Sequence, residues 1–360
     1  MKVDLTVAGD EEQVGLPPIT PPDPAALLCT FDSWVWVQLA AARRYPDHEL
    51  RGAWESLLAA TNAGKIQVAL TSGSYLELWN RANQQSRQRV AIAMAELTGY
   101  TTIRAVHEVV VEEAIQFIQT RRQGLGLQAA PLARVWMLGT GARHAFASRA
   151  GRFRFVESLA DTATPEGPEI EAPPELLADF DRASPEWFEW LNLAGVDNAY
   201  DVEGIDYRPT HREGDEWVDV QEQLRAFATR PGSEPSLLYR GLVRGRLKDV
   251  FGQLGNDAIT PRERAEWFTG PNDGVKFITA LPVQRVIVEL LHAAHRNKSY
   301  AFRQHDRVDV HELALTVPYC DVVVPDSHWA HLAHASRVDV EHCTLVVRGL
   351  KGFRAWAEGL

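Results

Sequence analysis

One stretch near the C-terminus constrains the fold more than any other part of this 360-residue chain. The stretch from Asp306 to Asp326 begins with the spacing of a short amphipathic helix, and after a Pro-Tyr turn the apolar run Cys320–Val324 indicates a strand covered on both faces. Asp309 lies near the start of that helix, and Asp326 follows the strand. In an α/β unit the helix runs antiparallel to the strand, so both aspartates reach one edge of the sheet. The sequence therefore predicts that Asp309 and Asp326 are neighbours in space.

Two further junctions of a strand and a helix are predicted near the N-terminus. Ala26–Phe31 is an apolar run that we expect to be a strand, and Asp32 follows it directly. Ile66–Leu70 is predicted as a second strand, and Glu77 lies in the helix expected to follow it. Because sites in open α/β sheets lie at the carboxyl ends of the strands, Asp32 and Glu77 are expected at the same edge as the two late aspartates.

These four carboxylates together predict a divalent cation. Crowded carboxylates repel one another, and burial raises the cost of keeping them charged, so a cation is needed to hold them together. All-oxygen ligands favour Mg²⁺ or Mn²⁺, and water activated by such an ion can attack a phosphodiester. The predicted metal ligands and catalytic residues are Asp32, Glu77, Asp309 and Asp326. The alternative is that each of them only caps a helix or a turn.

Two more aspartates lie in the C-terminal stretch. Asp306 precedes Asp309 by about one helical turn, and it is either a further ligand or a cap. Asp321 opens the strand that Asp326 closes, and five residues at about 3.3 Å each separate the two by roughly 16 Å. We therefore expect Asp321 at the opposite edge, in a structural role and paired with a buried donor.

The order of these pieces resembles the PIN-like nuclease domains. Their pattern is an Asp after the first strand, a Glu in an early helix, an Asp that opens a late helix and an Asp after the next strand. The matching pieces are Phe31-Asp32-Ser33, residues 74–78, residues 306–313 and residues 319–326. The resemblance implies an α/β protein with a three-layer α/β/α fold around a central parallel sheet. It also implies an Mg²⁺- or Mn²⁺-dependent endonuclease that cuts single-stranded or structured RNA, less often DNA.

The resemblance covers the two ends of the chain and suggests a division into domains. Residues 26–100 and 283–360 are predicted to form the PIN-like domain, and residues 101–282 a mostly helical insertion. Residues 1–25 contain a proline-rich run and are predicted to be an extended N-terminal arm.

Nucleic-acid contacts are predicted from arginines. In residues 134–155 basic side chains alternate with aromatic ones, a pattern that suits phosphate contacts combined with base stacking. The alternative is a solvated basic helix face. The residues predicted to bind nucleic acid are Arg81, Arg87, Arg143, Arg149, Arg152 and Arg154.

Composition limits the partners and the compartment. The net charge of −11 argues against a protein that coats nucleic acid without specificity. The three cysteines lie in or beside apolar runs, which predicts reduced thiols and a cytoplasmic protein. No run of about 18 apolar residues is present, so no membrane span is expected. The sequence leaves a second copy of the chain or a regulatory protein open as a further partner.

Two alternative functions stay open. Trp34 and Pro325 occupy positions where the PIN-like pattern has an Asn or Asp and a Thr, respectively. They favour a catalytically weak nucleic-acid-binding or scaffolding module. The second alternative is a DNA structure-specific nuclease with the same site.

Overall fold

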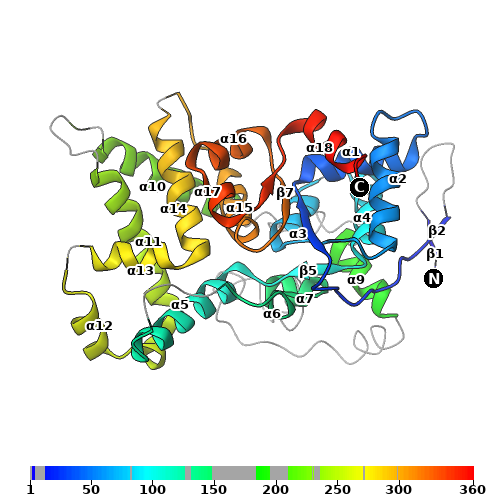
Figure 1. Ribbon diagram of the computed structural model, residues 1–360. Coiled ribbons are helices and arrows are strands. Elements are labelled where there is room, and N and C mark those ends of the chain that lie inside the picture. Colours follow the sequence, from blue (N-terminus) through cyan, green and yellow to red (C-terminus); the bar gives the residue numbers. More distant parts are fainter. Residues whose placement is uncertain are drawn as a thin grey trace, which may run out of the picture. The chain divides into compact units, whose positions relative to one another are not determined.

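The computed structural model gives a mixed α/β protein that is mostly helical (Figure 1). It describes residues 2–4, 13–81, 83–125, 131–147, 184–194, 210–228, 230, 236–270, 272–297 and 299–360. The chain divides into two compact units. Unit 1 comprises Met1–Ala105, Leu138–Pro209 and Arg354–Leu360, and unit 2 comprises Val106–Met137 and Thr210–Phe353. The two segments predicted to form one PIN-like domain are thus distributed over both units.

The described part of unit 1 contains three pairs of short strands. β1 (Lys2–Asp4) pairs with β2 (Gln13–Gly15) in antiparallel orientation, and β5 (Thr101–Ile103) pairs with β6 (Leu138–Thr140) in the same way. β3 (Leu27–Phe31) and β4 (Ile66–Val68) are parallel. The strand predictions for residues 26–31 and 66–70 are confirmed by β3 and β4. The pair β5–β6 was not predicted, because residues 101–282 were expected to be mostly helical.

Helices make up most of the rest of the described part of unit 1. They are α1 (Ser33–Arg44), α2 (Arg51–Asn62), α3 (Ser72–Trp79), α4 (Gln84–Thr98), α7 (Gly141–Phe146) and α9 (Pro185–Ala194). The junction of β3 and α1 is fixed by Trp36, which is fully buried and whose indole N–H donates to the carbonyl oxygen of Phe31 at 3.0 Å. This contact holds the turn at Asp32.

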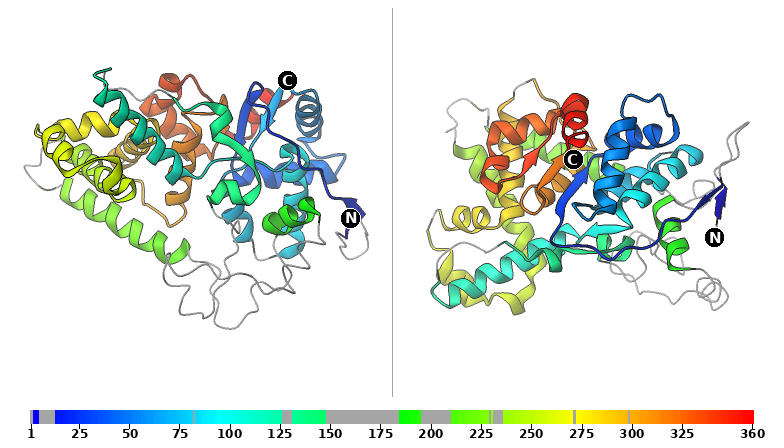
Figure 2. Two further views of the ribbon diagram at one scale, coloured as in Figure 1. Left: turned by 90° about the horizontal axis from the view of Figure 1, so that it is seen from below. Right: turned by 45° about the vertical axis from the view of Figure 1, so that its right-hand side comes forward.

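Unit 2 is built mainly from helices. They are α5 (Val106–Arg122), α6 (Arg134–Met137), α10 (Thr210–Ala228), α11 (Ser236–Ala258), α12 (Pro261–Trp267), α13 (Asp273–Ala280), α14 (Pro282–Arg296), α15 (Asp306–Thr316), α16 (Ser327–Ser336) and α17 (Val338–His342). α14 lies beside α11, α13, α15 and α16 (Figures 1 and 2). Its apolar residues, such as Val286 and Ile287, are buried. A last helix, α18 (Gly349–Ala357), contributes residues to both units.

The described residues of unit 2 include a parallel pair of strands. β7 (Val322–Val324) pairs with β8 (Leu345–Val346), and all three valines of β7 are buried. Burial on both faces explains why this strand is a continuous apolar run. The predicted helix–strand order is confirmed: α15 precedes β7, and α16 follows it.

The N-terminal segment is held against unit 1. Residues 16–26 form neither helix nor strand, and the backbone N–H of Thr20 donates to the carbonyl oxygen of Gly99 at 3.0 Å.

Among the described residues, no single helix is long and apolar enough to cross a membrane. α13 and α14 meet the length and composition criteria only together, and the chain bends by 108° between them.

Candidate metal site

The start of α15 is shaped by Asp306. This residue is 2% exposed, and its Oδ2 accepts a hydrogen bond from the backbone N–H of Arg303 at 2.7 Å. A side chain that reaches back to an unpaired backbone donor is a common way to begin a helix. Asp306 is thereby held rigidly at the first turn.

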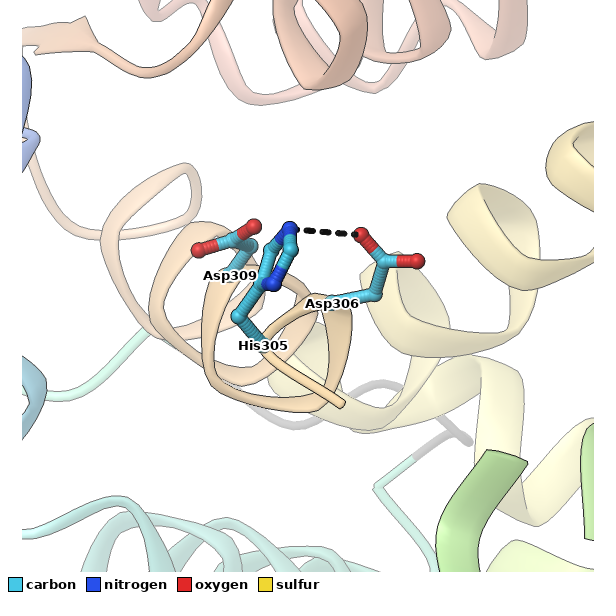
Figure 3. A group of neighbouring side chains, drawn as sticks. All are labelled: His305, Asp306 and Asp309. Atoms are coloured by element: carbon cyan, nitrogen blue, oxygen red, sulfur yellow. Dashed lines mark ion pairs between the residues drawn. The ribbon is translucent and has the colours of Figure 1, made fainter. Parts of the chain in front are cut away.

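Three potential metal ligands converge on this turn (Figure 3). One donor atom each from His305, Asp306 and Asp309 lies within 4.8 Å of the other two. They meet because residues four apart share one face of a helix. The imidazole Nε2 of His305 lies 3.9 Å from Oδ1 of Asp306. His305 is exposed, Asp306 is buried and Asp309 is half-buried, so the group is open on one side.

Trp329 connects Asp309 with Asp326. Asp326 follows β7 and caps α16, because its Oδ1 accepts a hydrogen bond from the backbone N–H of Trp329 at 2.7 Å. The indole N–H of the same buried residue donates to Oδ2 of Asp309 at 3.2 Å. The structure therefore brings together the two aspartates that the sequence places at one sheet edge.

The carboxylates of Asp306, Asp309 and Asp326 all act on the hydroxyl of Tyr300. Burial, a hydrogen bond to Asp306 and the negative charges of Asp306, Asp326 and Asp309 raise the pKa of its hydroxyl, with burial as the largest cause. The hydroxyl is thus a proton donor at neutral pH. The ring stacks on His328, with 4.1 Å between ring centroids and 9° between planes. Burial lowers the pKa of His328 despite the opposing charges of Asp326 and Asp306, which favours its neutral form.

This group of side chains is suited to a divalent cation. Carboxylate oxygens are the ligands that Mg²⁺ and Mn²⁺ prefer, and each of the three carboxylates is oriented by a hydrogen bond from Arg303, Tyr300 or Trp329. A cation placed between them would also reduce their mutual repulsion. His305 would add a nitrogen donor.

Two of the predicted ligands belong to unit 1. Asp32 directly follows β3 and caps α1, and its Oδ1 accepts hydrogen bonds from the backbone N–H of Trp34 and the hydroxyl of Ser33, both at 3.2 Å. Glu77 is half-buried in α3, whose start is capped by the hydroxyls of Thr71 and Ser74. That these two side chains share an ion with Asp309 and Asp326 stays a prediction of the sequence.

Asp321 does not belong to the metal-ligand group. It precedes β7, and its Oδ1 pairs with Nη2 of Arg134 at 2.6 Å. The guanidinium of Arg134 is partly exposed, so the partner is less buried than the sequence suggested. The ion pair still gives Asp321 the structural role that was expected.

The arginines predicted to bind nucleic acid differ in how exposed they are. Arg87 is 2% exposed, and its guanidinium donates to the carbonyl oxygens of Ala194 and Arg81 at 2.6 and 2.9 Å. Its predicted role is corrected, because a buried arginine that binds two carbonyls holds α9 on α4 and does not reach a phosphate. Arg81 is half-buried and Arg143 is exposed. Arg149, Arg152 and Arg154 lie outside the described residues.

Sequence reasoning missed His305, Tyr300 and Trp329 as parts of this site. His305 could have been recognised from the sequence, because it precedes Asp309 by four residues and therefore lies on the same face of the helix. Trp329 had a weaker one, because the third residue after a capping aspartate commonly donates to it. Tyr300 had none, since the loop before α15 determines its position.

Comparisons with protein-family models, with curated proteins and with solved structures gave no match. The PIN-like resemblance therefore stays a prediction from the motifs.

Proposed function

We propose that this chain is a divalent-metal-dependent phosphodiesterase that cleaves RNA. The observation that supports it is the convergence of Asp306, Asp309 and Asp326 on Tyr300 and Trp329. Asp326 follows the carboxyl end of β7, where open α/β sheets place their sites. The PIN-like three-layer arrangement, and Asp32 and Glu77 as further ligands, are parts of the proposal taken from the sequence.

Each side chain has a defined task in this proposal. Asp306 and Asp309 would hold Mg²⁺ or Mn²⁺ together with Asp326, while Arg303, Tyr300 and Trp329 keep the carboxylates oriented. The ion would supply Lewis-acid stabilisation of the phosphodiester and would activate water. Arg81 and Arg143 are the described arginines proposed to contact the nucleic-acid backbone.

Metal-dependent stability and cleavage test the proposal. A ligand that binds only the folded state raises the melting temperature, so Mn²⁺ or Mg²⁺ at millimolar concentration should raise it for the wild type and not for Asp309→Asn. Asp321→Asn is the matched control, because Asp321 pairs with Arg134 and does not belong to the metal-ligand group. It should keep the metal-induced shift. The wild type should also cut labelled RNA, and Asp309→Asn should lose about 100-fold or more in rate.

The outcomes separate the alternatives. No shift in melting temperature with either metal would sink the nuclease proposal. Cleavage of labelled DNA but not RNA would support the DNA structure-specific nuclease. If the wild type cuts neither RNA nor DNA but binds RNA in a fluorescence anisotropy titration, the non-catalytic module would be supported.

The non-catalytic module has one structural observation in its favour. Asp326 caps α16, and Asp309 binds the indole of Trp329. Both contacts stabilise the fold without a metal. If these contacts were the only role of the two aspartates, Asp309→Asn would change the melting temperature equally with and without Mn²⁺.

A further inference from the structure

We infer that His305 is a nitrogen ligand of the metal, and that it makes the site select a first-row transition ion such as Mn²⁺ over Mg²⁺. This inference rests on the metal site of the proposed function and deepens it. The sequence predicted a donor set of oxygens alone. The structure adds an imidazole to the same turn as Asp306 and Asp309 (Figure 3).

The separation of the donor atoms supports a shared ion. Nε2 of His305 lies 3.9 Å from Oδ1 of Asp306, which is too long for a hydrogen bond. Two donors that each lie about 2.1 Å from one ion are roughly 3–4 Å apart, depending on the angle between them. The observed separation is in that range. Asp309 supplies the third donor within 4.8 Å.

The imidazole has no other evident task in the described part of unit 2. His305 precedes α15 but makes no side-chain capping bond, because Asp306 already binds the unpaired backbone donor of Arg303. Because His305 is exposed, water screens its pair with Asp306 at 3.9 Å, and that pair contributes little to stability. A protein that needed only a helix start here would not require a histidine at this position.

The chemistry of the donor set then determines the metal. Mg²⁺ is a hard ion that prefers oxygen ligands and retains its waters. First-row transition ions accept imidazole nitrogen readily, and their affinity for mixed nitrogen and oxygen sites exceeds that of alkaline-earth ions. One imidazole beside two or three carboxylates therefore favours Mn²⁺, which is compatible with both donor types, over Mg²⁺.

Pulsed electron paramagnetic resonance of the Mn²⁺-loaded protein tests the ligand directly. A coordinated imidazole produces a nitrogen hyperfine coupling, which we expect in the wild type and not in His305→Gln. His331→Gln is the matched control, because His331 is an exposed histidine on α16 outside the metal-ligand group. It should keep the coupling.

Calorimetric titration of the metal-free protein tests the selectivity. We expect the wild type to bind Mn²⁺ at least about tenfold more tightly than Mg²⁺, and His305→Gln to lose most of this difference while Mg²⁺ binding is retained. A nitrogen coupling that persists in His305→Gln, or Mn²⁺ binding without any coupling in the wild type, would overturn the role of His305 and leave the metal site intact. Binding of neither metal by the wild type would overturn both this inference and the proposed function.

Discussion

At the scale of single residues, Glu113 is a fully buried carboxyl of unit 2 that keeps its proton. It is fully buried in α5, and it accepts hydrogen bonds from the hydroxyl of Tyr319 at 2.6 Å and from the backbone N–H of Val283 at 3.1 Å. Burial raises the pKa of this carboxyl from 4.5 to about 8, although both hydrogen bonds oppose the shift. Between about pH 4.5 and pH 8, the folded protein therefore keeps on Glu113 a proton that the unfolded chain has lost.

The raised pKa of Glu113 predicts how stability depends on pH. Between about pH 4.5 and 8 the folded state binds one more proton than the unfolded state, so the free energy of unfolding should fall as pH rises, by at most about 1.4 kcal/mol per pH unit. Glu113→Gln cannot ionise and keeps an acceptor for Val283. It should flatten the pH dependence and exceed the wild type in stability at about pH 8. Urea unfolding across this pH range measures the effect.

A neighbouring residue provides the control for this prediction. Glu112 is half-buried one position earlier in α5, and Glu112→Gln should leave the slope unchanged. An equal pH slope in the wild type and in Glu113→Gln would show that Glu113 does not keep the proton.

At the scale of elements, residues 16–26 contact the end of α4 through Thr20 and Gly99. Gly99 has φ +54°, a left-handed backbone conformation that residues with a side chain rarely adopt. A Cβ at this position would lie 2.5 Å from Oγ1 of Thr20. Gly64, which follows α2, has φ +66° but no heavy atom within 4 Å of such a Cβ. Gly64→Ala should cost about 1 kcal/mol of stability from the backbone alone. Gly99→Ala should cost at least about 1 kcal/mol more, as measured by urea unfolding.

The contact between Thr20 and Gly99 can be isolated by a double-mutant cycle. Thr20→Gly removes the atoms that clash, so the excess cost of Gly99→Ala over Gly64→Ala should largely disappear in that background. Equal costs of the two alanine substitutions in the wild-type background would mean that residues 16–26 move away freely and do not depend on α4.

Elements could be predicted where a short stretch of chain determines them. The neighbourhood of Asp309 and Asp326 followed from one helix–strand unit, and the cap at Asp32, which was the alternative to a metal ligand, follows from local hydrogen-bond chemistry. The burial of Arg87 could not be foreseen, because its carbonyl partner Ala194 is 107 positions away. The pair β5–β6 escaped prediction for a similar reason, since short strands far apart in sequence have little periodicity of their own.

At the scale of the whole molecule, the predicted ligands are distributed over two units. Asp306, Asp309 and Asp326 belong to unit 2, and Asp32 and Glu77 belong to unit 1. The sequence predicts one catalytic centre for Asp32, Glu77, Asp309 and Asp326, with Asp306 as a further ligand, and leaves a cap as the alternative for each of them. Hydrogen exchange measured along the chain can tell which units respond to the metal, because an ion that binds the folded state slows local opening around its ligands.

We expect Mn²⁺ to slow amide exchange in residues 300–310 and 324–330 of unit 2 and at the starts of α1 and α3 in unit 1. The reason is that each of these segments carries a proposed ligand, and binding raises the free energy of every opening that releases one. Mass spectrometry of peptides with and without Mn²⁺ measures this, and Asp309→Asn should show no change at any of the four segments. Protection confined to unit 2 would remove Asp32 and Glu77 from the ligand set. The metal would then be held by the aspartates around α15 and β7, with His305 as the inferred fourth donor.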